Sequence, residues 1–500
     1  MRLGLVTSRN ARPMLEDVIK GYDNVTVIEL PVHAIGHFAT KVVAKVIEAR
    51  RDILEKARSV DVILVPGTLR GSTDIIEEVV GRPVYKATKS IAGLPIVIEY
   101  IRKGYKLDKT RPAEEVLGSI KPEFTYEKAF SIGNVDIPYR GPPIVLFAEV
   151  NPSVSQSDFD ATVERHVAEG AQVIIVGVGG ETPPREAGKR VEKALAYTSA
   201  VVSEAPTPVH ADEALSAGAK GISVGVDSLE WALDRVGSGH VILLGDRDVD
   251  KLAWAVNRAK ELGIHVIADP VVGLPGIDLL ESMTRLIHAS KTIKAPLLFT
   301  AANVTEEIEA DSHGVHAVLA MLAVEASASG YLVVEEEYRS IHGVAEAREA
   351  LRLAMLSRSL LQTPRGLYSR LLVVKQSVRP RKPRRPLEAR LVGYVEPRMD
   401  KRGYIEVYVD HEKSVVGAAY RELGTGRVIA AFEGRHGNSV ARSLIRAVGL
   451  DPEHAAYLGA ELAKAEIALK LGRSYIQDED VIKPVWLDDD YEEGSGERSC

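Results

Sequence analysis

Polar side chains that could do chemistry follow a series of short apolar runs in the middle of the chain. The runs begin at residues 144, 173, 208, 221, 240, 264, 295 and 331, and the polar residues after the first seven are Asn151, Glu181, Asp212, Asp227, Asp246, Asp269 and Asn303. If the runs are parallel strands, these side chains meet at one carboxyl edge. Carboxylates and amides there can hold a divalent metal, or accept paired hydrogen bonds from a heterocycle with an amino group beside a ring N–H. For each acid taken alone, capping of the following helix is an equal explanation.

The elements that must position these residues are eight strands separated by helical patterns. Eight such units in about 230 residues are typical of a (β/α)8 TIM barrel, which we expect over residues 138–376. The third unit is the least regular, because only a short helical stretch follows residues 208–212. Seven strands and one irregular segment therefore remain an alternative.

The flanking regions predict two further domains. In residues 1–137, β-rich runs at 1–9, 24–31 and 60–67 alternate with helical stretches such as 39–59, which predicts an α/β, Rossmann-like domain with a parallel sheet. The segment GTLRGS at residues 67–72 follows a strand there; its backbone amides could cradle a phosphate, or it could be an ordinary turn.

Beyond the barrel, the chain turns from a basic connection to a small domain. Residues 377–391 are rich in Pro and Arg and predict an extended linker. Residues 392–485 predict an α+β domain, with an antiparallel ribbon followed by two helices, and the acidic segment 486–500 predicts a disordered tail.

Composition excludes several classes of function. The chain has 500 residues, 45% of them hydrophobic, and a formal charge of −7, so we expect globular domains with no general attraction to nucleic acid. Its one cysteine, Cys500, excludes an intramolecular disulfide and a cysteine zinc site. No apolar run approaches eighteen residues, and we expect a cytoplasmic protein without membrane spans.

Four segments of the barrel resemble a known family. They are AEVNPSVSQSDF from residue 148, AEGAQVIIVGVGGETPPREAG from 168, ADPVVG from 268 and IHGVAEAREALRLA from 341. In this order and spacing they resemble the pterin-binding barrel of dihydropteroate synthases and of folate or methanopterin methyltransferases. The whole chain resembles the archaeal dihydropteroate synthase-like proteins, whose appended domains have no assigned role.

The resemblance implies a role for each candidate residue. Asp212 and Asp269 grip the aminopyrimidine of a pterin, with Asp227 beside them where the synthases often have an asparagine. The other residues would contact the leaving group or stabilise its charge. Asn151 would lie near a pyrophosphate and its Mg²⁺, and Arg185 would contact a phosphate. His342 matches the histidine of the eighth strand and would supply part of the same stabilisation. Arg339 departs from the usual spacing to that histidine.

The seventh strand leaves the reaction open. Synthases carry a Ser-Arg-Lys there, whereas TAANVTEE resembles the Asn-Val-Ser of the methyltransferases, which makes Asn303 the pivotal residue. One expectation is condensation of a 6-hydroxymethyl-dihydropterin pyrophosphate with an arylamine in folate or methanopterin-type biosynthesis. The alternatives are methyl transfer from a methylated reduced pterin and a noncatalytic pterin-binding protein. A homodimer is compatible with such barrels; the sequence specifies neither the second substrate nor the oligomeric state.

Overall fold

The computed structural model describes residues 1–36, 38–117, 122–237, 239–360, 363–365, 367, 369–375, 390, 392–393, 395, 398 and 400–482. The chain divides into two compact units, Met1–Arg379 and Pro380–Cys500. The expected linker 377–391, apart from Arg390, and the expected tail 486–500 lie outside the described residues. No helix in the described part of the chain is long and apolar enough to cross a membrane.

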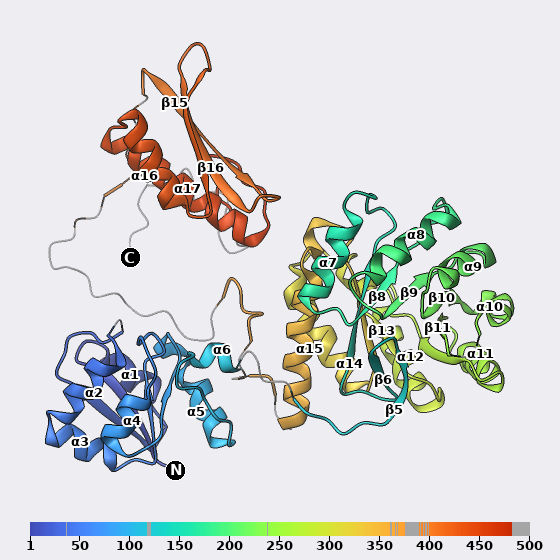
Figure 1. Cartoon of the computed structure of the whole chain (residues 1–500), viewed down its shortest axis with the longest axis horizontal. Coiled ribbons are helices and arrows are strands. Elements are labelled where there is room, and N and C mark those ends of the chain that lie inside the picture. Colours follow the sequence, from blue (N-terminus) through green and yellow to red (C-terminus); the bar gives the residue numbers. More distant parts are fainter. Residues whose placement is uncertain are drawn as a thin grey trace. The chain divides into compact units, whose positions relative to one another are not determined.

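The middle of the chain is a barrel of eight parallel strands (Figure 1). The strands are β7 (Val145–Val150), β8 (Val173–Val176), β9 (Val201–Glu204), β10 (Gly221–Gly225), β11 (Val241–Gly245), β12 (His265–Asp269), β13 (Leu298–Thr300) and β14 (Gly330–Val334). Each strand from β7 to β11 pairs with the next in chain order, β13 pairs with β14, and β14 pairs with β7. A bridge between Ala268 and Leu297 joins β12 to β13 and brings the sheet to near closure. The predicted (β/α)8 fold is confirmed.

Helices cover the outside of the barrel. They are α7 (Phe159–Glu169), α8 (Pro184–Leu195), α9 (Pro208–Ser216), α10 (Leu229–Arg235), α11 (Val249–Glu261), α12 (Leu279–Thr292), α14 (Ser312–Glu325) and α15 (Gly343–Leu360), with the short α13 (Ala302–Thr305), η2 (Val226–Ser228) and η3 (Tyr338–Ser340) in the loops.

The position predicted for the third strand is wrong. Residues 208–212 begin α9, and the strand is β9, which starts seven residues earlier at Val201. The physical reason is local: Pro208 lacks an N–H and has a φ suited to the first turn of a helix, whereas Val201 and Val202 are β-branched and fit a buried strand.

The inside of the barrel follows from the alternation of side chains along each strand. Val145 and Phe147 of β7 point inward, where they pack with a hairpin formed by β5 (Lys128–Ile132) and β6 (Val135–Pro138). Leu146 and Ala148 point outward into the core beneath the helices. Because the period is two residues, the next inward position on β7 is Glu149. The same count gives Gly177, Glu204, Asp269, Thr300 and Glu336 on other strands.

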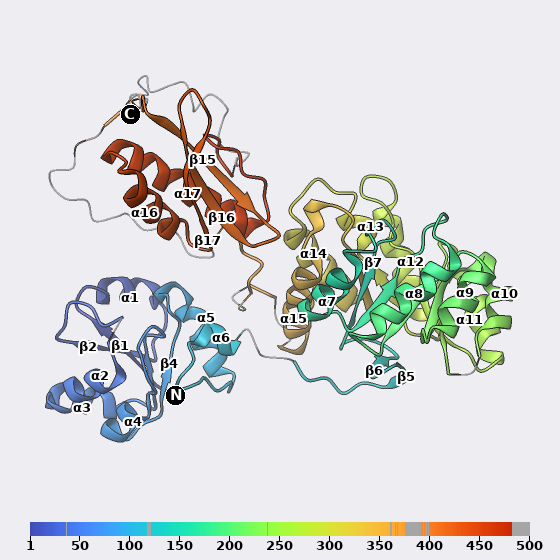
Figure 2. The same ribbon diagram turned by 45° about the horizontal axis from the view of Figure 1, so that its top comes forward.

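The N-terminal domain has a parallel sheet in the order β2-β1-β3-β4 (Figure 2). Its strands are β1 (Leu3–Ser8), β2 (Val25–Leu30), β3 (Val62–Val65) and β4 (Val84–Lys86). One face packs against α1 (Arg12–Val18) and α5 (Leu94–Arg102), which follows η1 (Ile91–Gly93). The other face packs against α2 (Thr40–Glu48), α3 (Arg51–Arg58) and α4 (Asp74–Val80), and α6 (Ala113–Leu117) follows later in the chain. The expected parallel sheet is present, and the helical stretch 39–59 forms two helices rather than one.

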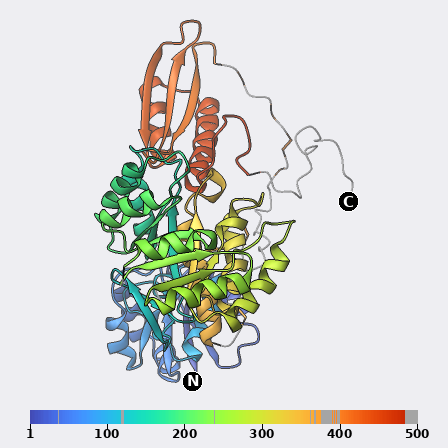
Figure 3. The ribbon, with the colours of Figure 1, turned by 90° about the vertical axis from the view of Figure 1, so that its right-hand side faces the viewer.

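The C-terminal domain is a three-stranded antiparallel sheet with two helices (Figure 3). The elements are β15 (Gly403–Asp410), β16 (Val415–Glu422), β17 (Val428–Gly434), α16 (Gly437–Val448) and α17 (Pro452–Leu471). Asp451 caps α17 by accepting from the backbone N–H of Glu453 at 2.9 Å. Val416 and Leu462 lie in its separate core, as expected for an α+β module.

Candidate functional site

Two glutamates form the innermost acidic layer of the barrel. Glu149 lies on β7 and Glu204 ends β9, and β8 between them continues into Gly177. A Cβ at Gly177 would lie 2.6 Å from the Val150 carbonyl oxygen and 3.0 Å from Glu149 Oε1. A glycine is therefore required after β8, because any side chain there would collide with the backbone of β7 and the Glu149 carboxyl.

The two carboxyls resist ionisation. Burial, together with the neighbouring charges of Glu204 and Glu336, raises the pKa of Glu149 to about 8. Burial also raises the pKa of Glu204, although its carboxylate accepts a hydrogen bond from Val178 N–H at 2.9 Å. Both side chains nevertheless keep some contact with solvent. Partly accessible carboxyls with raised pKa values are typical of binding and catalytic sites.

Asn151 links this layer to the rim. Its Nδ2 donates to Glu336 Oε1 at 2.6 Å, and its Oδ1 accepts from Ser153 N–H at 2.8 Å. Asn151 and Glu336 continue the inward positions of β7 and β14, two strands that are paired. The amide is thereby fixed in one orientation above Glu149.

A second polar group ends the strands β12 and β13. Thr300 Oγ1 donates to Asp269 Oδ2 at 2.6 Å, and Val271 N–H donates to Asp269 Oδ1 at 2.8 Å. Asn303 Nδ2 donates to the Val272 carbonyl at 2.8 Å, so the same loop holds both Asp269 and Asn303. Burial raises the pKa of Asp269 to about 6, and the two hydrogen bonds oppose this rise. Asp269 is therefore mostly ionised at neutral pH.

Asp212 lies away from the strand ends. It belongs to the outer helix α9, its side chain is 52% exposed, and it pairs with Arg235 at 3.4 Å. The prediction that Asp212 ends a strand is wrong, because the third strand ends at Glu204. Glu204 is the carboxylate that this strand contributes to the interior.

Asp227 and Arg185 are surface residues. Asp227 is 92% exposed and pairs with Lys251 at 2.7 Å, and the same lysine reaches Asp246 at 3.0 Å. These contacts raise the pKa of Lys251 to about 12. Arg185 is exposed in the first turn of α8, close in sequence to the loop that follows β8.

His342 faces the helical layer. Its Nδ1 lies 2.5 Å from Glu169 Oε1 at the end of α7, and this pairing raises the pKa of His342. Glu335 shows the same outward direction, since it lies 2.6 Å from Arg165 of α7. Outward residues of β14 such as Val333 pack beneath the helices, and Glu335 continues that series. The structure therefore brings Asn151, Asp269 and Asn303 to the strand ends but directs His342 toward α7.

The residues fit a magnesium ion poorly. The described residues contain no group of three or more histidine, cysteine or acidic side chains arranged to hold a metal. Both polar atoms of the Asn151 amide already have partners. We therefore derive no chemical step through a metal.

Sequence reasoning missed Glu149 and Glu204 because it took the polar residue after each strand. The inward alternation offered the better signal: Val145, Phe147 and Glu149 are spaced by two, and so are Ala200, Val202 and Glu204. A carboxylate at the end of such an apolar series points into the barrel.

Arg190 is a further buried residue with an evident role. It donates to the carbonyls of Pro152 at 3.2 Å and Val154 at 3.0 Å, and its guanidinium lies 5.4 Å from the centre of the Phe159 ring. It therefore anchors the loop that carries Asn151.

Arg190→Ala should destabilise the barrel by about 2 to 4 kcal/mol, because two charge-assisted hydrogen bonds and their packing are lost. The measurement is the thermal unfolding midpoint of the full chain. Arg185→Ala, five residues earlier and exposed, is the matched control. Equal midpoints for both variants would contradict the anchoring role.

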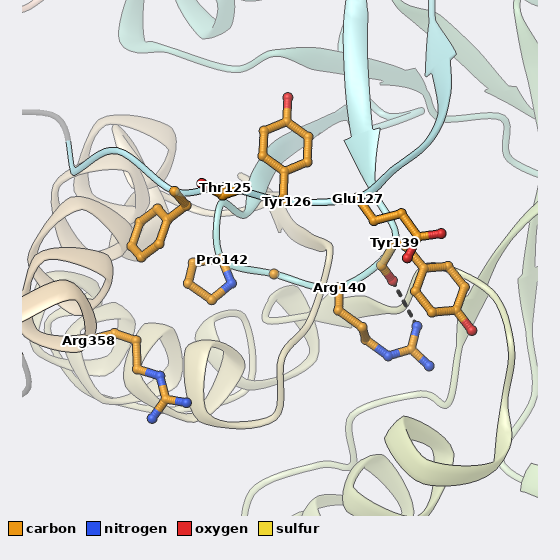
Figure 4. Close-up of a pocket in the computed structure, with 9 residues that line it drawn as sticks. Thr125, Tyr126, Glu127, Tyr139, Arg140, Pro142 and Arg358 are labelled. Carbon is orange, nitrogen blue, oxygen red and sulfur yellow. Dashed lines mark hydrogen bonds between the residues drawn. The ribbon is translucent and has the colours of Figure 1, made fainter.

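A cavity of about 560 Å³ lies at the opposite, amino end of the barrel (Figure 4). Arg140 is turned back toward the Tyr139 carbonyl, which it reaches at 2.8 Å, and it also donates to the Ala295 and Ile293 carbonyls. The hydrogen bonds of Arg140 are made to backbone carbonyls and hold together the loops at the amino end of the barrel. Its role is therefore structural, and the cavity has no assigned function.

The fold and the site define a (β/α)8 barrel protein with an acidic site at the carboxyl ends of its strands. Residues 399–478 match the family model described as PterinBD-DUF4346. A relative from Methanocaldococcus jannaschii, the uncharacterized protein MJ0107, is 24% identical over 527 residues, which cover 96% of this chain and 99% of that protein.

Similar solved structures include dihydropteroate synthases. The Burkholderia cenocepacia enzyme complexed with 7,8-dihydropteroate is 16% identical, with a TM-score of 0.38, over 48% of this chain and 99% of that chain. The Thermus thermophilus enzyme in complex with 6HMPPP is 22% identical, with a TM-score of 0.34, over 42% and 92%. Because these values are low, the fold assignment rests on the strand order of the barrel itself. The family-model match covers β15 to α17 of the C-terminal domain and does not include the barrel.

Proposed function

We propose that the barrel binds a reduced pterin and transfers a one-carbon unit from its ring nitrogen to a nucleophilic acceptor. The observation that carries this proposal is the joint fixing of Asp269 and Asn303 by one loop at the ends of β12 and β13. The barrel segments that resemble the pterin-binding proteins, among them ADPVVG with Asp269, add support for the ligand.

The residues suit a pterin because their acceptors match its donors. An ionised Asp269 can accept two parallel hydrogen bonds from the amino group and adjacent ring N–H of the pyrimidine edge. Each of its oxygens keeps a lone pair beyond the Thr300 and Val271 contacts. The bond to Val272 orients Asn303. Within the described residues its Oδ1 has no hydrogen-bond partner, so it can accept from a ring N–H.

The reaction needs a proton on the departing nitrogen. As the bond from nitrogen to the methyl carbon breaks, its electron pair stays on the nitrogen, and the acceptor's electron pair forms the new bond to carbon. Protonation makes the nitrogen a better leaving group. Glu149 holds its proton near neutral pH and can serve as that acid.

Condensation of a dihydropterin pyrophosphate with an arylamine is the second candidate. The exposed Arg185 favours it, because a guanidinium near the strand ends can contact a phosphate. The acidic interior opposes it, because Glu149, Glu204 and Glu336 offer a departing pyrophosphate no cation.

Calorimetry with the full chain tests the proposal. We expect an N5-methylated tetrahydropterin to bind equally well with and without Mg²⁺, and more tightly than 6-hydroxymethyl-dihydropterin pyrophosphate. Tighter, Mg²⁺-dependent binding of the pyrophosphate would favour the second candidate. Binding of neither compound would refute the pterin assignment.

A further inference from the structure

The N-terminal domain has its own cavity, of about 290 Å³, at the carboxyl edge of its sheet. Its walls come from the ends of β1, β3 and β4 and from the segment after β2. In the order β2-β1-β3-β4, β1 is flanked by β2 on one side and by β3 on the other. The connection after β1 leads to β2, whereas the connection after β3 leads away from it, to β4. The loops after β1 and β3 therefore diverge, and such a switch point is where open α/β sheets bind ligands.

Hydroxyl groups without protein partners line this cavity. Thr7 and Ser8 are only 4% and 3% exposed, and Thr68 is half-buried. Across the described residues, the structure gives none of these three hydroxyls a hydrogen-bond partner. None of the three oxygens is among the fully enclosed side-chain atoms without partners, so solvent reaches them. They are therefore open to a ligand that accepts or donates a hydrogen bond in the cavity.

The charge of the lining selects an anion. Lys89 and His33 line the cavity, and among the described lining residues there is no aspartate or glutamate. Lys89 Nζ lies 3.4 Å from Glu115 Oε1 in an exposed pair, which a phosphate can replace. This lining is opposite in character to the acidic interior of the barrel.

The cavity is shaped by the loop after β3. Gly67 N–H donates to the Thr88 carbonyl at 3.1 Å, and a Cβ at Gly67 would lie 2.4 Å from the Ala87 carbonyl oxygen. The loop therefore lies directly against the segment that follows β4, which only glycine permits. The rest of the lining is largely apolar, with Leu15, Ile35 and Leu94 among it.

We propose that this cavity binds a purine nucleoside monophosphate, with the base against the apolar wall and the phosphate near Thr68 and Lys89. The volume lies at the lower limit of small-molecule sites, which suits one nucleotide rather than a dinucleotide. The GTLRGS loop lacks the glycine pattern that holds a pyrophosphate, which also favours a single phosphate.

Calorimetry of the full chain with AMP and GMP tests this site. Adenosine and inorganic phosphate are used alone as probes for the nucleoside half and the phosphate half of the ligand. We expect at least one nucleotide to bind more tightly than either half. Lys89→Gln and Thr68→Val should each weaken binding about 10-fold, as the loss of one hydrogen bond to a charged group predicts. Gly36→Leu should abolish it, because a Cβ there already lies 3.3 Å from Thr68 Oγ1.

Lys41→Gln, on the exposed surface of α2, is the control and should bind like the wild type. Thermal midpoints equal to the wild type show that the variants are folded. The proposal is overturned if neither nucleotide binds at millimolar concentration, if adenosine binds as tightly as AMP, or if folded Gly36→Leu protein binds unchanged.

Discussion

Asp269→Ala should weaken binding of a reduced pterin by at least about 100-fold. The carboxylate supplies two charge-assisted hydrogen bonds in the proposed complex, each with a net value of about 1.5 to 3 kcal/mol. Asp269→Asn should cost less, since its oxygen can still accept from Val271 N–H and from one ligand donor. Titration of the full chain with an N5-methylated tetrahydropterin measures both effects.

Asp212→Ala is the matched control for this experiment. The same substitution is made at a carboxylate that lies on α9 and pairs with Arg235, so pterin binding should not change. A large loss in this variant, or unchanged binding in folded Asp269→Ala protein, would refute the assigned site.

Glu149→Gln should make the barrel markedly less sensitive to alkaline pH. In the unfolded chain Glu149 ionises near its ordinary value of 4.5, whereas in the folded barrel its pKa is about 8. Folding therefore takes up a proton between these values, and the free energy of unfolding falls as pH rises through this window. The slope is about 1.4 kcal/mol per pH unit for one proton, and it disappears above the folded pKa.

The measurement is the thermal unfolding midpoint from pH 5 to pH 9 for the wild type and the variant. Glutamine is neutral throughout, so the two curves should diverge with rising pH, with the variant the more stable above pH 8 by roughly 2 to 5 kcal/mol. Glu181→Gln, at an exposed loop position, should follow the wild-type curve. Parallel curves for Glu149→Gln and the wild type would show that Glu149 is ionised in the folded protein.

The fold could be predicted largely from periodicity. Seven of the eight barrel strands lie where apolar runs predict them, since a buried parallel strand needs a continuous apolar segment whatever its neighbours are. The exception is β9. The segment from Pro208 is predicted as the third strand in its place, because both stretches mix small and apolar residues. Local composition distinguishes a short buried strand poorly from the first turn of a helix.

The site could be predicted only in part. Asp269, Asn151 and Asn303 were found because a residue directly after a strand stays near its end. Asp227 follows the same rule, yet it lies on the surface. His342, which the resemblance suggested, pairs with Glu169 of α7. Position after a strand fixes the end of the barrel at which a side chain lies, but the direction of that side chain depends on register.

The sequence by itself determined the barrel, its flanking domains and an excess of carboxylates at the strand ends, because these follow from hydrophobic period and residue type. The tertiary structure decided which carboxylates face one another. Closure of the sheet sets which alternate side chains point inward, and so it brings Glu149, on β7, and Glu204, on β9, together across fifty-five residues of chain. Their raised pKa values arise from that proximity and burial, which no local pattern encodes.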